Sequence, residues 1–129
     1  MKKFVLTFCV CLGCFSFSNA QSTDEKIAEA MNNSDWFALD SLYQTEPKDS
    51  ISEFLEIFSR CLIGNRLNRP DVSIPAFAEL FNTQSENLDL GNLLNSSMMF
   101  AMDLSRIGDN KTAAKMLSST LSSIRTHLD

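Results

Sequence analysis

Two residues in this sequence, Cys61 and His127, are of the types that form a nucleophilic pair. A histidine beside a cysteine takes up the thiol proton, and the two residues meet in the fold rather than in the sequence. Cys61, however, falls on a stripe of apolar residues, where a thiol packs as a small hydrophobic group. His127 is the only histidine, with no cysteine or carboxylate cluster near it. We interpret both as structural residues and predict no metal and no cofactor.

Glu53 and Glu56 are three residues apart, a spacing that places both carboxylates on one face of a helix. Paired carboxylates can perform acid and base catalysis. Near the start of an amphipathic helix, however, acidic residues usually form a solvated face that interacts favourably with the helix dipole. No catalytic motif surrounds the pair, so we predict that the chain is not an enzyme.

Residues that could contact a partner protein are Trp36, Arg60, Arg66 and Arg69. The three arginines form the densest basic cluster in an acidic chain, and an arginine fork binds carboxylates well. Trp36 could anchor a partner if it were exposed. The alternative is that the arginines make the turn soluble and pair with Asp71, while Trp36 packs in the core.

Three methionines, Met98, Met99 and Met102, could form an adaptable peptide-binding surface, because methionine side chains repack easily. Met98 and Met102 share a helical stripe with Leu94. We therefore expect these methionines to fill the core instead.

The chain begins with a pattern typical of secretory signal peptides. Lys2 and Lys3 precede an uncharged apolar run, residues 4–17, and small residues then lead to a cleavage site between Ala20 and Gln21. The apolar run is too short to span a membrane comfortably, and no later run is long enough. We expect residues 1–20 to be removed and the mature protein to be exported, without a transmembrane span.

A second interpretation of the N-terminus is a lipoprotein signal. Leu12-Gly13-Cys14 resembles a weak lipobox, and cleavage there would leave a lipid anchor on Cys14. Cleavage after Ala20 would remove Cys9, Cys11 and Cys14 and leave Cys61 as the only cysteine. An intramolecular disulfide is therefore not expected.

Length and charge limit the function classes. The 129 residues suffice for one domain, and the full chain has a net charge of −5. Loss of Lys2 and Lys3 leaves nine basic against sixteen acidic residues, or −7. This charge repels phosphates, so we predict no nucleic-acid partner.

After residue 20, apolar residues recur with the period of amphipathic helices, which predicts three helical hairpins at about 22–46, 50–83 and 91–128. Ser22 and Glu25 have capping-box spacing, as do Ser50 and Glu53. The spacing predicts turns at residues 64–71 and 82–91.

The fourth helix contains a proline that limits where the helix can begin. Because a proline inside a helix removes a hydrogen bond, we expect Pro75 to lie in the first turn and Ser73 to cap the helix. No segment has the alternation of a strand, so the predicted fold class is all-α.

Two of the hairpins repeat with a shift of 37 residues. Gly64 corresponds to Ala101 and Ala76 to Ala113, and large apolar residues follow at matching positions. Small residues at these places would let paired helices approach closely. The spacing resembles a degenerate tetratricopeptide repeat, which implies antiparallel hairpins stacked as a short array within one domain, residues 21–129. Chance similarity of two pairs of apolar helices is the alternative.

Three short motifs suggest a family. Together with the signal peptide, residues 24–27 (DEKI), 34–39 (SDWFAL) and 64–71 (GNRLNRPD) resemble the N-terminal helical region of secreted retropepsin-like aspartic-protease-family proteins of Bacteroides-type bacteria. In those proteins a tetratricopeptide-like helical region precedes an all-β protease domain. The catalytic Asp-Thr/Ser-Gly turn of that family has no counterpart here, because Asp40-Ser41 and Asp49-Ser50 are each followed by an apolar residue rather than by glycine.

The sequence therefore favours a non-catalytic exported module that mediates protein–protein or domain–domain interaction, as the accessory region of an aspartic-protease-family protein. One alternative is a small exported enzyme, which requires a polar pocket that brings together Glu53, Glu56, Arg60 or His127. The other is a structural fragment of a longer protease. It predicts an exposed apolar face on the last helix, formed by Leu121, Ile124 and Leu128.

Overall fold

The computed structural model of the chain describes residues 21–129. Within that range the regular structure is helical, which confirms the all-α prediction. The helices are α2 (Thr23–Asn32), α3 (Trp36–Thr45), α4 (Glu53–Arg66), α5 (Pro70–Thr83), α6 (Leu90–Arg106) and α7 (Asn110–Leu128), with short 3-10 helices η1 (Lys48–Ser50) and η2 (Ser85–Asn87) between them. The predicted signal peptide, the residue before its cleavage site and the alternative lipid anchor at Cys14 lie outside the described residues.

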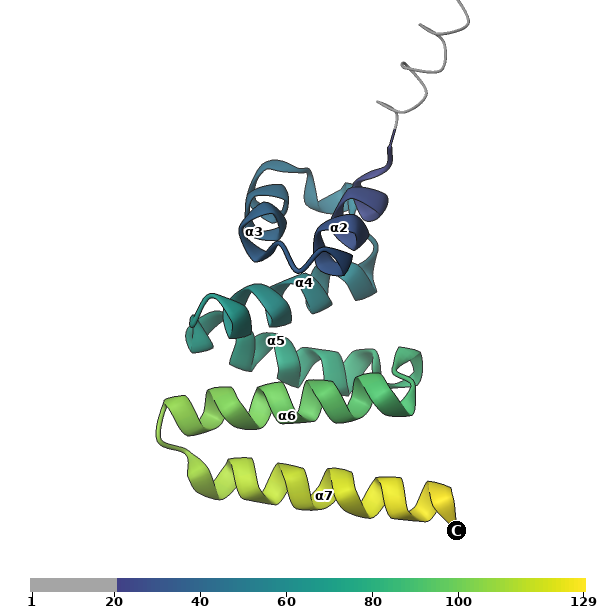
Figure 1. Cartoon of the computed structure of the whole chain (residues 1–129), viewed down its shortest axis with the longest axis vertical. Coiled ribbons are helices and arrows are strands. Elements are labelled where there is room, and N and C mark those ends of the chain that lie inside the picture. The colour runs from purple at the N-terminus through teal and green to yellow at the C-terminus, as the bar shows by residue number, and fades with distance from the viewer. Residues whose placement is uncertain (1–20) are drawn as a thin grey trace, which may run out of the picture.

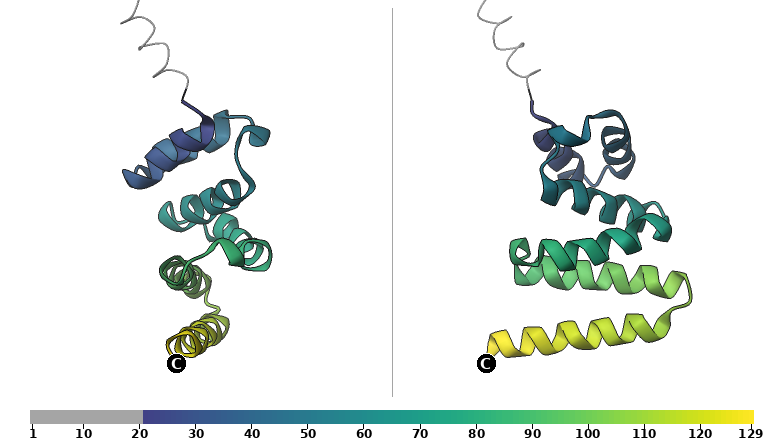
Figure 2. Two further views of the ribbon diagram at one scale, coloured as in Figure 1. Left: turned by 90° about the vertical axis from the view of Figure 1, so that its right-hand side faces the viewer. Right: turned by 180° about the vertical axis from the view of Figure 1, so that it is seen from behind.

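The helices pack in the order in which the chain produces them. Each helix contacts the next, and α4 also contacts both α2 and α6. Figure 1 shows α4 to α7 one beneath another, with consecutive helices running in opposite directions. Seen from the side, α4 and α6 lie on one side of the molecule and α5 is displaced to the other (Figure 2). Because α5 lies on the other side, α2, the start of α3, α4 and α6 together form one long surface of the molecule.

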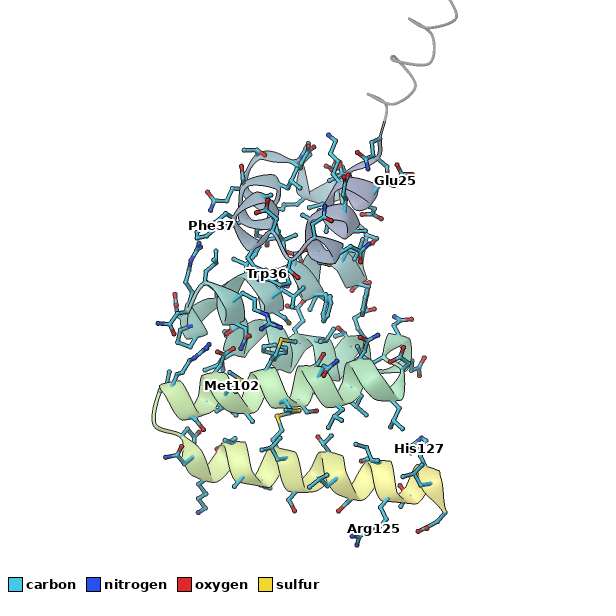
Figure 3. The ribbon with its side chains drawn as sticks, viewed as in Figure 1. Glu25, Trp36, Phe37, Met102, Arg125 and His127 are labelled. Atoms are coloured by element: carbon cyan, nitrogen blue, oxygen red, sulfur yellow. The ribbon has the colours of Figure 1, made fainter. Side chains whose placement is uncertain are left out.

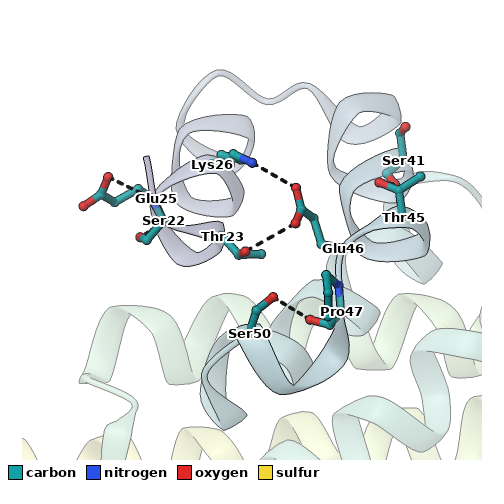
Figure 4. Close-up of polar contacts among 9 residues, drawn as sticks. All are labelled: Ser22, Thr23, Glu25, Lys26, Ser41, Thr45, Glu46, Pro47 and Ser50. Atoms are coloured by element: carbon teal, nitrogen blue, oxygen red, sulfur yellow. Dashed lines mark hydrogen bonds and ion pairs between the residues drawn. The ribbon is translucent and has the colours of Figure 1, made fainter. Parts of the chain in front are cut away.

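The first pair of helices is fixed by polar contacts at its ends. Ser22 and Glu25 form the predicted capping box at the start of α2. Glu46, just after α3, accepts hydrogen bonds from Lys26 Nζ at 3.0 Å and from Thr23 Oγ1 at 3.4 Å (Figure 4). These bonds join the end of α3 to the start of α2, so the hairpin is closed where the chain turns toward α4.

The predicted cap of α4 is wrong. Ser50 lies in η1 and its hydroxyl donates to the carbonyl of Pro47 at 2.6 Å (Figure 4). The helix begins at Glu53, after Ser52, whose backbone N–H donates to Asp24 Oδ1 at 2.9 Å. The tertiary contact with α2, rather than a local capping box, therefore sets where α4 starts.

The predicted start of α5 is also wrong. The helix begins at Pro70, whose missing N–H costs nothing at the first helical position, so Pro75 lies inside the helix. Pro75 is exposed, and water can therefore reach the backbone carbonyl left without its usual donor. Ser73 is completely buried and donates to Asp103 instead of capping α5. A long-range bond has replaced the local one.

The main core lies where α2 to α6 meet. Phe77 on α5 is fully buried and stacks on Phe100 of α6 with ring centroids 5.5 Å apart. Burial of each such side chain contributes roughly 1.5–3 kcal/mol. The other fully or almost fully buried large apolar residues are Ile27, Leu39, Ile57, Cys61, Ile63 and Leu80. A second, smaller cluster between α6 and α7 contains Ala101, Leu104 and Ala113.

Small residues allow α4 and α5 to approach closely. A Cβ atom added to Gly64 would lie 2.4 Å from the backbone nitrogen of Ser73, a distance that real atoms do not adopt. Ala76 on α5 is fully buried, and the corresponding residues of the last pair, Ala101 and Ala113, are 4% and 5% exposed. The residues at the predicted small positions therefore all lie between packed helices.

Among residues 21–129, none of the helices combines the length and the apolar character that crossing a membrane would require.

Candidate functional site

The residues considered for nucleophilic chemistry do not meet. Cys61 is completely buried in the core side of α4, and this burial raises the pKa of its thiol well above the usual range. His127 is exposed in the last turn of α7, where its Nδ1 lies 2.8 Å from the carbonyl of Ser123 (Figure 3). Cys61 is therefore a protonated core thiol, as predicted, and His127 is a surface residue.

The two carboxylates, Glu53 and Glu56, lie in different environments. Glu53 is exposed, whereas Glu56 accepts hydrogen bonds from Tyr43 at 2.7 Å and from two nitrogens of Arg60 at 3.0 Å. Burial tends to raise the pKa of Glu56, but the bonds from Arg60 and Tyr43 outweigh it and hold the pKa below its usual value. Arg60 extends the network to Glu79 at 2.6 Å. Glu56 therefore joins α3 to α4 as a charged acceptor, and Arg60 carries the network on to α5.

The same network changes the phenol of Tyr43. Burial, together with the hydrogen bond to the Glu56 carboxylate and its negative charge, raises the pKa of Tyr43 to about 12. The hydroxyl thus remains a donor at every physiological pH, which suits a structural link between α3 and α4.

The three arginines do not form one patch. Arg60 pairs with Glu56 and Glu79, and Arg69 pairs with Asp40 of α3. The hydrogen bond from Arg69 is the largest cause of the lowered pKa of the Asp40 carboxyl. The sequence predicted that the arginines pair with Asp71, and this partner is wrong. Arg60 and Arg69 pair instead with acidic residues of other helices that the fold brings close.

Arg66 differs from the other two arginines because its contact is aromatic. It is exposed at the end of α4, and its guanidinium carbon lies 5.3 Å from the centre of the Trp36 ring. Trp36 is half-buried, with one side packed against the main core. The structure therefore brings together two of the four predicted contact residues, Trp36 and Arg66, and separates Arg60 and Arg69 from them.

Trp36 and Arg66 line a groove of about 620 Å³ along the surface formed by α2, the start of α3, α4 and α6. We call it the Trp36 groove. Figure 3 shows Trp36 near the start of α3 and Met102 across from it on α6. The lining is apolar except for asparagine amides and one charged residue, Arg66, and consists of Met31, Asn32, Trp36, Phe58, Leu62, Arg66, Asn92, Asn95, Met98, Met99 and Met102.

The expected core position is wrong for Met98 and Met102, which are each 50% exposed. It is confirmed for Met99, which is buried in the main core. The stripe that they share with Leu94 does run along one face of α6, but none of the helices within residues 21–129 covers that face over Met98 and Met102. Their flexible thioethers therefore form the wall of the groove rather than filling the interior.

Sequence reasoning also missed the polar lining. Asn92 and Asn95 are exposed on α6, three residues apart, and line the same side of the groove. Neither asparagine belongs to a sequence motif that would mark it as a binding residue. The signal that could have found them is their helical spacing with Met98 and Met102, which continues one face of α6.

Among residues 21–129, no three histidine, cysteine, aspartate or glutamate side chains are grouped so that they could hold a metal ion. Comparison of the whole chain with protein-family models, with curated proteins and with solved structures found no match. The geometry of the groove is therefore the basis on which a function can be argued.

Proposed function

We propose that this protein is a non-catalytic exported module that binds a segment of another protein in the Trp36 groove. One observation carries the proposal. Three helices far apart in the sequence bring Trp36, Arg66 and two half-exposed methionines, Met98 and Met102, to one groove of about 620 Å³. An aromatic ring, an arginine and adaptable methionines are the side chains that dominate protein-binding surfaces.

The lining indicates what kind of segment would bind. The amides of Asn92 and Asn95 can each donate to and accept from the backbone of an extended peptide. Met98 and Met102 would accommodate an apolar side chain, and Arg66 would bind a carboxylate. We therefore propose an extended segment that carries an apolar residue and an acidic side chain or a C-terminal carboxylate as the ligand.

The architecture that would support this role is a short tetratricopeptide-like array of three stacked hairpins. Its support is the shift of 37 residues between α4–α5 and α6–α7, with buried small residues at the corresponding positions. On this proposal the chain serves as the accessory region of an aspartic-protease-family protein, and the groove binds either a protease domain or the protein on which it acts.

The groove is tested by selecting short peptides from a random library displayed on phage and measuring their binding to the purified protein. Trp36 is the only tryptophan in the chain, so its fluorescence reports on the groove itself. We expect selected peptides to be acidic and apolar and to shift the Trp36 emission to shorter wavelength as they cover the ring. The substitution Arg66→Ala should weaken their binding roughly tenfold, the loss of one charge-assisted contact.

The matched control is Arg125→Ala, which removes an exposed arginine from α7, far along the chain from the groove (Figure 3). Binding that is unaffected by Arg66→Ala, or equally weakened by both substitutions, would contradict the proposal. Peptides that bind without changing the Trp36 emission would place the contact elsewhere.

Export has its own test, because it depends on residues 1–20. Sequencing the N-terminus of the protein recovered from the medium or periplasm of a bacterial host should give Gln21 as the first residue. A lipid-modified Cys14, or an intact N-terminus in the cytoplasmic fraction, would contradict cleavage after Ala20.

A further inference from the structure

A second surface of the molecule is open where the corresponding surface of the preceding helix pair is covered. A cavity of about 520 Å³ between α6 and α7 is lined by Met98, Ala101, Met102, Arg106, Ala113 and Leu117, among others. The residues 37 positions earlier are Cys61, Gly64, Asn65, Arg69, Ala76 and Leu80. All of these are buried except Arg69, which is half-buried, whereas the remaining lining residue, Ser105, corresponds to the exposed Asn68. The same part of the repeat is therefore a covered surface in one pair and an open one in the next.

The helix that covers the first surface is α6. Its Phe100 stacks on Phe77 of α5, and the carbonyl of its Met99 accepts a hydrogen bond from Asn65 of α4 at 3.2 Å. Because α6 lies across α4 and α5, the corresponding surface of α6 and α7 has the shape to accept one further amphipathic helix in the same orientation.

The part of this surface that α7 forms also carries large, exposed apolar side chains. Leu121 is 63% exposed, whereas Gln84, 37 residues earlier, is 8% exposed. Leu128 is 76% exposed and Ile124 is half-buried, so the apolar face that the sequence predicted on the last helix is present. Contiguous exposed apolar residues of this kind mark interaction surfaces.

The polar contacts that fix α6 are not repeated on the open surface. Asn65, which bonds to α6, corresponds to Met102, and Ser73, which bonds to Asp103, corresponds to Asn110 at the exposed start of α7. The open surface consequently lacks the side-chain groups that hold α6 on α4 and α5, and its occupant needs no buried acid.

Charge determines which kind of helix fits. Arg106 is the one charged residue that lines the cavity, and α7 contains no acidic residue, although the whole chain has a net charge of −5. Arg125 lies one turn after Leu121, on the outer side of α7 that points away from α6 (Figure 3). A helix seated beside Leu121 would therefore have a basic residue at its edge, which favours acidic residues on the flanks of the occupant.

A second copy of the chain fits less well. Pairing α7 with α7 would bring two basic helices together, at an electrostatic cost. Placing the acidic α2 of another copy on the surface would oppose Leu121 with a helix that has no large exposed apolar side chain. We propose that the α6–α7 surface binds an acidic amphipathic helix of a different protein. This site shares Met98 and Met102 with the wall of the Trp36 groove but goes beyond the proposed function, because Leu117, Leu121 and Arg125 are not part of that groove.

The test uses three synthetic peptides of about 18 residues, or five helical turns. One has leucine on one face and glutamate on the other, the second replaces glutamate with lysine, and the third has the composition of the first in scrambled order. We expect the Leu/Glu helix to bind the purified protein at least roughly tenfold more tightly than the other two. Leu121→Asp and Arg125→Glu should each weaken this binding by a similar factor, and both change exposed residues, so the fold should be retained.

Phe37→Asp is the matched control, because it changes an exposed apolar residue of α3 that lines neither site, and it should leave the binding of the Leu/Glu helix unchanged. Arg66→Ala tells the two sites apart: binding that is lost in Arg66→Ala but kept in both α7 variants would place the peptide in the Trp36 groove and overturn the proposal. Equal binding of the Leu/Lys or scrambled peptide, or binding that survives both α7 substitutions, would overturn the proposal. So would a dimer in sedimentation that Leu121→Asp dissociates, because the occupant would then be a second copy.

Discussion

The hydroxyl of Ser73 donates a hydrogen bond of 2.6 Å to Oδ2 of Asp103, and neither residue is exposed to solvent. The other carboxylate oxygen of Asp103 is 2.6 Å from Nη1 of Arg106, which also donates to the backbone carbonyl of Asn65 at 2.9 Å. One buried carboxylate thus joins α4, α5 and α6. A buried charge is stable in a fold only when it is paired and hydrogen-bonded in this way.

We expect Asp103→Ala to lower the free energy of unfolding by about 1–3 kcal/mol or more, because it leaves the buried Ser73 hydroxyl without its acceptor and removes the ion pair with the partly exposed Arg106. Ser73→Ala removes one bond to a charged group and should cost about 1–3 kcal/mol. Urea unfolding of both variants and of the double variant measures the coupling between the two residues. Additive losses would show that the bond contributes nothing of its own.

Substitution of two glycines should have opposite effects. A Cβ at residue 64 would lie 2.4 Å from the Ser73 nitrogen and 2.5 Å from its Cβ, so Gly64→Ala must push α4 and α5 apart. We expect a loss of about 1–3 kcal/mol or more. Gly91→Ala is the control: its Cβ would meet only Asp89 Oδ1, at 3.5 Å, and alanine should stabilise α6 by up to about 1 kcal/mol. Thermal unfolding that shifts in the same direction for both variants would be inconsistent with this packing.

The stability of the fold should decline in acid because of Glu56 and Asp40. Both carboxyl groups have pKa values lowered in the folded state, Glu56 by Arg60 and Tyr43 against the effect of burial, and Asp40 mainly by Arg69. Groups of this kind contribute stability above their unfolded pKa of about 4, and this contribution is lost as pH falls through the lower folded values.

Urea midpoints measured from about pH 7 to about pH 3 should therefore decrease toward acid. In Glu56→Gln, which cannot ionise, the decrease should be shallower while the stability at neutral pH is lower. An acid dependence identical to that of the unmodified protein would mean that Glu56 titrates alike in the folded and unfolded chain.

Cys61 should be unreactive until the protein unfolds. The thiol is completely buried and its pKa is raised, so little thiolate is present and reagents cannot reach it. In a variant with serine at residues 9, 11 and 14, a thiol-specific disulfide reagent should react with Cys61 only at the rate of unfolding. The same variant in urea gives the reference rate. Rapid reaction of the native protein would restore Cys61 as a candidate nucleophile.

Much of the secondary structure could be predicted because it depends on neighbouring residues. The period of apolar residues around Phe54 and Leu62 indicates a helix, and the capping box of Ser22 and Glu25 is a local arrangement that the structure retains. Local reasoning failed at Ser50 and Ser73. Each was expected to cap a helix, but Ser50 bonds within a 3-10 turn and Ser73 bonds to an aspartate thirty residues away.

The sequence predicted some residues of the candidate site but not their arrangement. Trp36 and Arg66 were among the predicted contact residues, but nothing in their spacing shows that one lies over the ring of the other. Arg60 and Arg69 look the same as Arg66 in the sequence, yet acids from other helices pair with them. Which arginine remains available to a ligand is decided by which carboxylates the fold brings near.

By itself, the sequence determined the all-α class, the approximate extent of each helix and the acidic charge, because periodicity, capping and composition act over a few residues. Only the tertiary structure decided which apolar faces are covered. Cys61 and Met98 are apolar residues at corresponding positions, 37 residues apart, but one is fully buried and the other is 50% exposed. The physical reason is that a helix lies over α4 and α5 but none of the described helices lies over the same side of α6 and α7, and burial depends on the neighbour rather than on the residue.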